Sequence, residues 1–308
     1  MKYNLSIIIP FFNSRKLIEK NFKKIYNIKK KFNGVEIIYI DNNSTDKTYK
    51  ILKKKQLILK NFSLFKTDKK KGQGPGVARN LGVIKSKSEY ILYLDVDDYL
   101  KIKNFKKIIS FLKIYKPNIT YLEKKSDQIL APYIMYNKYN LKKYFKNTNN
   151  MEIIGIILNK NFLIKNKIFF KSKFYEDIFY SFLAHFYNKK KIFTSSDIIY
   201  NKKMNKDSIT NRKTSIFHLY SKFNAWKSID LFLKKQLVKK NYKKLLPHIQ
   251  YRWRGELANE YIKINKQILH KKKKLFLINS IVKKYKRFIL NNYKFVTFKD
   301  RIVSQLIK

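Results

Sequence analysis

The first hundred residues alternate between short apolar runs and segments with helical periodicity, and this alternation limits the possible folds more than any other feature. The apolar runs that we expect to be strands are 5–10, 35–40, 61–67 and 89–96. The expected helices between them are 15–30, 46–55 and 77–86. The runs are almost continuously apolar, which is typical of parallel strands buried on both faces. The pattern therefore predicts an α/β domain with a sheet flanked by helices.

The composition supports a folded protein and restricts its chemistry. Hydrophobic residues make up 44% of the 308 residues, with only 7 Gly and 5 Pro, which excludes disordered and collagen-like chains. There is no cysteine, so disulfides, iron–sulfur clusters, cysteine nucleophiles and thiolate zinc sites are excluded. The 4 histidines do not have the spacing of a helix-borne zinc motif. We therefore expect any metal to be a hard cation on carboxylates.

The charge is extreme, with 71 Lys and Arg against 20 Asp and Glu and a net charge of +51. Such a charge favours an anionic partner: a nucleic acid, a nucleotide substrate or an anionic membrane surface. The sequence is also rich in Lys, Asn, Ile, Tyr and Phe, all of which have AT-rich codons. Lysine runs such as 271–274 can therefore equally reflect genome composition on solvated faces.

A domain boundary is expected near residue 214, where the pattern changes to long lysine-rich amphipathic segments. We expect a domain at 1–214 and a basic helical region at 215–308, whose 94 residues hold 24 Lys and Arg and 4 Asp and Glu. The aromatic residues of this region fit two roles, entry into a lipid headgroup layer beside the lysines or packing in a core. They are Trp226, Trp253, Phe276, Tyr285 and Phe288.

The chain has no run of about 18 uncharged apolar residues, so no membrane-spanning helix is expected. The apolar run at the N-terminus stops at Pro10 and is too short for a secretory signal. We therefore expect the protein in the cytoplasm or on the inner face of the cytoplasmic membrane.

Three aspartates follow the fourth expected strand within four positions: Asp95, Asp97 and Asp98. Carboxylates this close repel one another, and Mg²⁺ or Mn²⁺ would stabilise them. Because Mg²⁺ is usually held by one or two carboxylates together with substrate phosphates, the cluster points to a diphosphate ligand. The alternative is that Asp97 and Asp98 cap a helix beginning near Lys101.

Polar residues also follow the first two strands, at Phe12 and Asn13 and at Asp41 and Asn42. The carboxyl ends of strands in an open α/β sheet form the crevice where ligands bind, so these residues should converge on one edge. Ser44 or Thr45 is expected to cap the next helix, but capping does not explain Asp41. A carboxylate at the end of a buried strand can accept hydrogen bonds from a base or a ribose.

Three of the 7 glycines, Gly72, Gly74 and Gly76, lie within five positions and are followed by Arg79 and Asn80. The spacing matches neither a Walker loop nor the dinucleotide-binding motif. A glycine-rich approach to a helix that carries an arginine suits an anion. The alternative is a plain turn with the arginine on the surface.

Four segments within residues 5–100 resemble, in this order and near the usual spacing, the family 2 glycosyltransferases of the GT-A fold: SIIIPFFN, IDNNSTDKT, GPGVARNLG and LDVDDYL. The resemblance implies a nucleotide-binding α/β domain with a mixed sheet. It also implies transfer of a sugar from a nucleoside diphosphate, usually UDP, with inversion at the anomeric carbon. The resemblance further implies a role in the synthesis of a bacterial surface polysaccharide, with a glycan or lipid-linked acceptor.

The resemblance also implies the role of individual residues. The donor-binding residues would be Pro10, Phe12, Asp41, Asn42, Arg79, Asp95 and Asp97. The metal ligands would be Asp97 and Asp98. Where the family often has Asp after the first acid of its second segment, this chain has Asn42, which weakens the expectation for that side chain alone.

Past residue 100 one further feature resembles the family, the acidic pair Glu176 and Asp177 before an expected helix. In the family the aspartate of this pair is the general base. An acceptor hydroxyl that attacks an anomeric carbon must lose its proton, and one carboxylate opposite the leaving group is sufficient for inversion. The metal and Arg79 would stabilise the departing diphosphate. The alternative is an acidic pair that only begins a helix.

Two other functions compete with a glycosyltransferase. The charge and the interleaved aromatics also suit a nucleic-acid-binding protein, but carboxylates at strand ends would repel phosphate without a metal. A binding module that has lost its activity is the other alternative, and the intact Asp95, Asp97 and Asp177 disfavour it. We therefore expect a nucleotide-sugar donor, no nucleic acid, and a peripheral contact with an anionic membrane through the basic C-terminal region.

Overall fold

The computed structural model describes residues 3–59, 62–71, 74–126, 141–146, 152–171, 175–203, 215–267 and 271–289. The chain forms two compact units. The first, here called the sheet unit, comprises Met1–Tyr139 and Met151–Asn205. The second, the helical unit, comprises Asn140–Asn150 and Lys206–Lys308. Asn140–Asn150, which lies well before the boundary expected near residue 214, thus belongs to the same unit as the C-terminal helices. The sequence pattern does not indicate this grouping.

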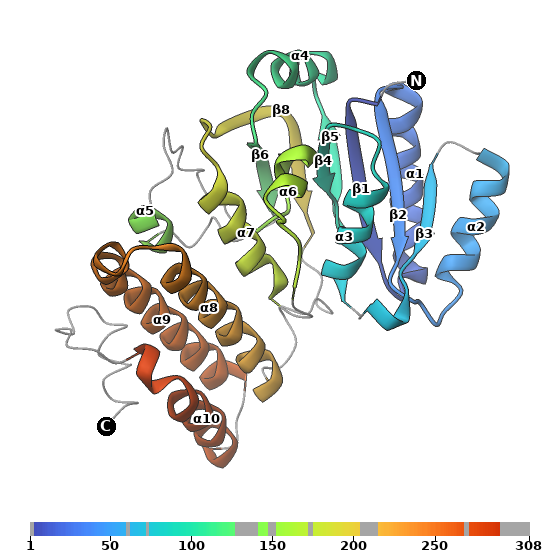
Figure 1. Cartoon of the computed structure of the whole chain (residues 1–308). Coiled ribbons are helices and arrows are strands. Elements are labelled where there is room, and N and C mark those ends of the chain that lie inside the picture. The colour runs from blue at the N-terminus through green and yellow to red at the C-terminus, as the bar shows by residue number, and fades with distance from the viewer. Residues whose placement is uncertain are drawn as a thin grey trace. The chain divides into compact units, whose positions relative to one another are not determined.

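Within the described residues, the sheet unit holds one mixed sheet of eight strands in the order β3-β2-β1-β4-β7-β6-β8-β5 (Figure 1). The strands are β1 Leu5–Phe11, β2 Val35–Asp41, β3 Ser63–Lys66, β4 Tyr90–Tyr93, β5 Tyr99–Ile102, β6 Ile119–Ser126, β7 Ile156–Asn159 and β8 Phe193–Lys202. The strands β3, β2, β1 and β4 are parallel, as the sequence predicts. β7 then runs antiparallel to both β4 and β6.

The helices of the sheet unit are α1 Arg15–Lys31, α2 Thr48–Leu59, α3 Pro75–Lys85, α4 Phe105–Tyr115, α6 Lys160–Lys165 and α7 Glu176–Tyr187, with a short 3₁₀ turn η1 at Lys69–Lys71. The helices expected from the first hundred residues are therefore present as α1, α2 and α3, with shifted ends. The helical unit holds α5 Leu141–Lys146, α8 Ile216–Gln236, α9 Lys239–Gln267 and α10 Lys271–Ile289.

The helix expected near Lys101 is wrong, because strand β5 occupies that position. Tyr99–Ile102 pairs with β8 in antiparallel register, and pairing with a distant strand overrides the local pattern. Helix α4 begins only at Phe105, where the side chain of Asn104 accepts a hydrogen bond from the backbone N–H of Lys107. Asp97 and Asp98 therefore cap no helix here.

The central strands are buried on both faces, which explains their continuous apolar runs. Alternate residues of β1, from Leu5 to Phe11, join one core cluster with the apolar faces of α1, α2 and α4. On the opposite face, Ile8 lies directly against α3, where a Cβ built on Gly82 would come within 2.3 Å of it. The missing side chain at Gly82 thus lets α3 lie close to the sheet.

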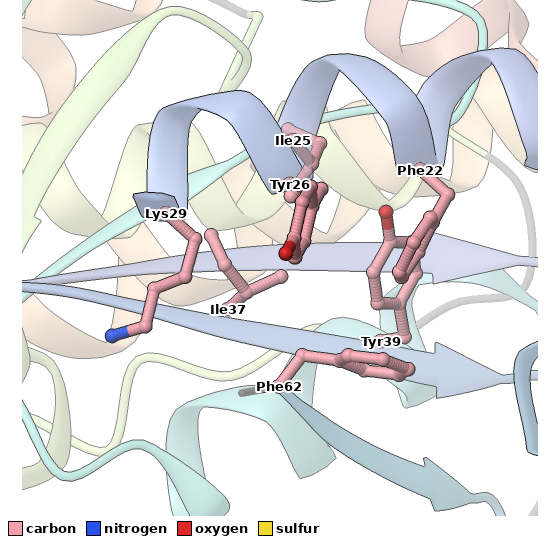
Figure 2. A pocket seen from close by; sticks show the side chains of 7 residues that line it. All are labelled: Phe22, Ile25, Tyr26, Lys29, Ile37, Tyr39 and Phe62. Carbon is pink, nitrogen blue, oxygen red and sulfur yellow. The ribbon is translucent and has the colours of Figure 1, made fainter. Parts of the chain in front are cut away.

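A small pocket lies between α1 and the face of β2, as Figure 2 shows. Its lining is almost entirely apolar or aromatic: Phe22, Ile25, Tyr26, Lys29, Ile37, Tyr39 and Phe62. The Tyr39 hydroxyl donates to Asn21 Oδ1 at 2.8 Å, and the Lys29 ammonium donates to the Val35 carbonyl at 2.6 Å. These polar groups are therefore already satisfied within the fold, and we assign the pocket to core packing rather than to function.

The helical unit has an aromatic core. Trp226, Trp253 and Tyr285 are each at most 1% exposed. The ring centroids of Trp253 and Tyr285 lie 5.5 Å apart. These three residues are therefore core residues and cannot enter a headgroup layer, whereas Phe276 is 62% exposed. The side chain of Phe288 lies outside the described residues.

None of the helices in the described part of the chain has both the length and the apolar character of a membrane-spanning segment.

Candidate functional site

Polar residues gather at the carboxyl edge of the parallel strands. β2, β1 and β4 are neighbours with the same direction, so the loops that follow Asp41, Phe11 and Tyr93 leave from one edge. The two loops after β1 and β2 are joined directly, because the backbone N–H of Thr45 donates to Asn13 Oδ1 at 2.8 Å. The loop after β4 carries the three aspartates.

Arg79 on α3 is the centre of a charged network at this edge. Its Nη2 donates to Asp95 Oδ1 and its Nη1 to Glu176 Oε1, both at 2.9 Å. Burial alone would lower the pKa of the guanidinium, but the carboxylates of Asp95 and Glu176 outweigh this effect and raise the pKa above its ordinary value. One arginine thus connects the end of β4 with the start of α7, 97 residues apart in sequence.

This geometry gives Arg79 two contacts that the sequence does not predict. The sequence predicts an arginine that stabilises the departing diphosphate. In the structure the side chain is 8% exposed, and both terminal nitrogens already donate to carboxylates. Arg79 therefore acts here as a positioning residue that holds Asp95 and Glu176.

Asp177 stands beside this network, in the first turn of α7. The residue before the acidic pair, Tyr175, has a left-handed backbone with φ 53°, which turns the chain sharply into the helix. Burial, followed by repulsion from Glu176, raises the pKa of Asp177 to about 7. The acidic pair therefore does begin a helix, but Glu176 is ion-paired to Arg79 and Asp177 has the pKa of a proton acceptor near neutral pH.

Close contact between α3 and the segment before α7 brings these groups together. Asn80 donates through Nδ2 to the Phe170 carbonyl and accepts from the Phe170 N–H through Oδ1, each at 2.9 Å. A Cβ on Gly76 would lie 2.7 Å from Phe170 Cβ and 3.0 Å from Glu176 Cγ. Gly76 is therefore required for this approach. Gly74 has φ 123° just before α3, and Gly72 lies outside the described residues.

The turn after β4 is fixed by strand β8. The Tyr200 hydroxyl donates to Asp98 Oδ2, and the Lys203 backbone N–H donates to Asp98 Oδ1 at 2.7 Å. The same hydroxyl accepts from the Asp95 backbone N–H at 3.3 Å. Burial raises the pKa of Asp98 to about 7. Asp98, expected as a metal ligand, thus has both carboxylate oxygens bound within the fold, and it holds the turn that carries Asp97.

The loop after β2 leaves one buried carboxylate oxygen available. Asp41 Oδ1 accepts from the Ser44 N–H at 2.9 Å. Its Oδ2 is buried, has no hydrogen-bond donor among the described residues and lies 3.9 Å from Lys66 Nζ. Asn42 is turned toward Thr67, whose hydroxyl donates to Asn42 Oδ1 at 3.4 Å. The oxygen of Asp41 thus fits a ligand donor, while Asn42 supports the loop.

The remaining donor-site residues differ in their exposure. Pro10 is buried within β1, opposite Ile40. Phe12 is 54% exposed just past the end of the strand, where its ring can stack on a ligand. The helix after this loop begins at Thr48, and Asp46 rather than Ser44 or Thr45 accepts the Thr48 N–H, at 2.9 Å.

A second charged group, which the sequence pattern does not indicate, is formed by Lys124, Glu152 and Lys202. Lys124 Nζ and Lys202 Nζ lie 2.9 and 3.0 Å from the two oxygens of Glu152. Burial opposes ionisation, but the two lysines outweigh it and lower the pKa of Glu152 to about 2. Gly155 makes room for Lys124, since a Cβ there would lie 2.7 Å from Lys124 Cε. The pairing of β6 with β8 brings Lys124 and Lys202 together, and the pairing of β6 with β7 brings in Glu152, so no local sequence pattern indicates this group.

The carboxylates fit a divalent cation that has few protein ligands. No group of three metal-binding side chains occurs among the residues that the structure describes. Asp97 lies half-buried in the turn, and the ion pair of Asp95 with Arg79 uses only Oδ1. A hard cation held by one or two carboxylates takes its other ligands from water and substrate phosphates. Asp97, with Asp95 beside it, suits such a cation, whereas Asp98 does not.

Comparison with known proteins identifies the class of protein to which this fold and its polar sheet edge belong. The sequence model described as glycosyl transferase family 2 matches residues 6–193. The chain belongs to glycosyl transferase family 2.

Individual relatives cover smaller regions. The chain is 32% identical over 108 residues to an uncharacterized glycosyltransferase of Haemophilus influenzae, covering 35% of this chain and 42% of that protein. It is 29% identical over 184 residues to the poly(ribitol-phosphate) beta-N-acetylglucosaminyltransferase TarP of Staphylococcus aureus, covering 54% of this chain and 52% of that protein. The alignments thus span about half of the length of these relatives.

The fold is also found in a solved structure, that of S. aureus TarS residues 1–349 in complex with UDP-GlcNAc. The TM-score is 0.64 at 18% identity, over 95% of this chain and 94% of that chain. This likeness confirms the predicted GT-A fold.

Proposed function

We propose that this glycosyltransferase moves a sugar from a nucleoside-diphosphate sugar, with a UDP-sugar as the first candidate, to a hydroxyl of a glycan or lipid-linked acceptor, and that it inverts the anomeric carbon. The observation that supports the proposal is the arginine-centred network, in which Arg79 pairs with Asp95 after β4 and with Glu176, the residue before Asp177. Relatives whose names describe transfer to poly(ribitol-phosphate) support a cell-surface polysaccharide as the acceptor class.

The donor is proposed to bind along the carboxyl edge. Asp41 Oδ2, which accepts no hydrogen bond within the described residues, supports a contact with a base N–H, and the exposed ring of Phe12 supports stacking on the base. The Asp95 carboxylate, held by Arg79, accepts from a ribose hydroxyl. A bound Mg²⁺ or Mn²⁺ at Asp97 would neutralise charge on the diphosphate.

Asp177 is proposed to be the general base. The acceptor oxygen forms a bond to the anomeric carbon while its proton passes to the Asp177 carboxylate. The bond from the anomeric carbon to the diphosphate oxygen breaks, and the electron pair leaves with the diphosphate. A single carboxylate then suffices, because attack from the face opposite the leaving group inverts the centre in one step.

A donor panel tests the proposal. Full-length protein is incubated with UDP-, GDP- and dTDP-sugars and either Mg²⁺ or Mn²⁺, and released nucleoside diphosphate is measured. We expect release from at least one donor, with loss in EDTA and a fall of at least about 10²-fold in Asp97→Ala. Glu19→Ala, an exposed acid on α1, is the matched control and should retain full activity. Full activity in EDTA would remove the metal from the proposal.

A further inference from the structure

The helical unit shows an unusual separation of its charges. Its described residues include three acids, Asp230, Glu256 and Glu260, and each is at most 6% exposed. Each is also held by cations of the same unit: Lys234 lies 3.0 Å from Asp230, and Lys222 lies 2.7 Å from Glu260. The described surface of this unit therefore carries lysines and no exposed carboxylate.

Codon composition does not account for this separation. A compositional bias raises the number of lysines in a chain but does not decide which acids are buried. The sheet unit, built from the same residue usage, has exposed acids at Glu19, Asp68 and Glu89. The cationic surface of the helical unit is therefore a property of its fold.

Helix α10 adds exposed apolar side chains to this charge. It contains eight Lys and Arg and no Asp or Glu. Leu277, Ile278, Ile281 and Val282 face the core, whereas Phe276 is 62% and Leu275 49% exposed. Lys272 and Lys283, both exposed, lie four residues before and seven residues after Phe276 and therefore share its helical face. We call Lys272, Lys273, Leu275, Phe276 and Lys283 the α10 face.

We propose that the α10 face docks the protein on an anionic lipid bilayer, with Phe276 and Leu275 entering the headgroup layer and the lysines contacting lipid phosphates. This combination of a basic face with exposed apolar side chains is typical of helices that lie in a membrane interface. Docking on a bilayer is a further property beside the proposed transfer reaction and does not depend on that reaction.

A bilayer fits this face better than a nucleic acid does. Two arginines of this unit have described side chains, Arg252 and Arg254, and they are only 7% and 2% exposed. Their planar forks, which would bind phosphate in a bidentate manner, are therefore not offered to a partner. The α10 face offers lysines, and of its two exposed apolar side chains Phe276 can stack on a base but the aliphatic Leu275 cannot. An aliphatic side chain beside point charges suits the boundary between lipid headgroups and acyl chains.

Vesicle binding of the full-length chain tests the proposal. Sedimentation is measured with vesicles of equal parts phosphatidylglycerol and phosphatidylcholine, and with phosphatidylcholine alone. We expect binding to the anionic vesicles only, with release as salt rises. Lys272→Glu/Lys283→Glu should weaken binding by at least about 25-fold, since each lysine near the surface contributes about fivefold. Phe276→Ser should weaken it by about tenfold.

Matched variants of the sheet unit distinguish binding through the α10 face from binding through the overall positive charge of the protein. Lys30→Glu/Lys53→Glu changes the net charge equally, and Ile84→Ser removes an apolar side chain that is 64% exposed. Both should bind vesicles within about threefold of the wild type. A Phe276→Trp reporter should shift its fluorescence to the blue on anionic vesicles, above the constant signal of the buried Trp226 and Trp253. Ile84→Trp should show no shift.

Three results would overturn the proposal. The first is no binding to the anionic vesicles, and the second is equal weakening by the sheet-unit and α10 charge variants. The third is tight binding of a 20-nucleotide RNA that the α10 variants abolish while vesicle binding is absent, which would assign the face to nucleic acid. Turnover of a nucleotide sugar in vesicle-free buffer should be the same in the α10 variants and the wild type, so this test stands apart from that of the reaction.

Discussion

At the scale of single residues, the site depends on one buried arginine that forms ion pairs with two carboxylates. Arg79 connects Asp95 to Glu176 through two bonds of 2.9 Å and is almost fully buried. A lysine, a single point charge, cannot hold two carboxylates in this geometry. The sequence places an arginine near the donor, but its exact partner Glu176 lies too far along the chain for any local pattern to indicate the pair.

Replacing Arg79 should therefore be costly. Arg79→Met keeps the length of the side chain but leaves Asp95 and Glu176 without their cation. We expect the free energy of unfolding to fall by about 3–5 kcal/mol at pH 7, measured by urea denaturation. The loss should shrink as the pH falls and Glu176, whose pKa is raised by burial, becomes protonated. Arg15→Met, at an exposed position, should change it by less than about 0.5 kcal/mol, and an equal loss in both variants would contradict this role.

At the scale of elements, the approach of α3 to the start of α7 shapes the site. The glycine-rich segment before α3 predicts an anion site, yet the structure gives Gly76 a steric reason: its neighbours Phe170 and Glu176 leave no room for a Cβ. Asn80 then fixes the same approach through two hydrogen bonds to Phe170. The glycine signal was visible in the sequence, but its cause depends on a contact with a residue nearly a hundred positions away.

A pair of glycine substitutions tests this packing. Gly76→Ala should lower the free energy of unfolding by about 1–3 kcal/mol, because Phe170 and Glu176 must move. Gly255→Ala is the matched control, since it also lies within a helix and its Cβ would meet nothing within 4 Å. It should raise stability by about 0.5–1 kcal/mol, as alanine favours helix over glycine. Thermal unfolding of both variants measures the two shifts, and a shift of the same sign would contradict the steric role of Gly76.

The strands show what local pattern can and cannot predict. The buried runs that became β1, β2 and β4 are continuous because helices cover both of their faces, and such runs are readable from sequence. Strand β5 and the clamp of Tyr200 on Asp98 were not predicted. Both depend on β8, which joins the sheet from a hundred residues away. Pairing partners at that separation leave no periodic signal.

At the scale of the whole molecule, the net charge of +51 follows directly from the sequence, but the distribution of the charges over the folded surface does not. The basic C-terminal region was expected from composition. That its described acids are all buried, and that Trp226 and Trp253 are core residues, depends on helix packing. The resemblance to the family, by contrast, can be read directly from short ordered motifs at strand ends, and the family model matches residues 6–193.

The most direct test of the proposed reaction is Asp177→Asn, which keeps the shape of the side chain but removes its proton acceptor. Release of nucleoside diphosphate from a donor, to water or to an added acceptor, should fall by at least about 10²-fold while nucleotide affinity stays within about twofold. In the wild type, kcat/KM should fall as the pH drops below about 7, where burial has raised the pKa of Asp177 and the carboxylate becomes protonated.

The stability of Asp177→Asn shows whether a loss of activity could come from misfolding. Because the pKa of Asp177 is raised in the folded state, its ionised form lowers stability as the pH rises through about 7. Asp177→Asn should therefore be at least as stable as the wild type at pH 8. We expect Asp177→Asn to be a stable protein that binds nucleotide but does not release nucleoside diphosphate from the donor. Undiminished turnover, or a parallel collapse of nucleotide affinity, would contradict the role of Asp177 as the base.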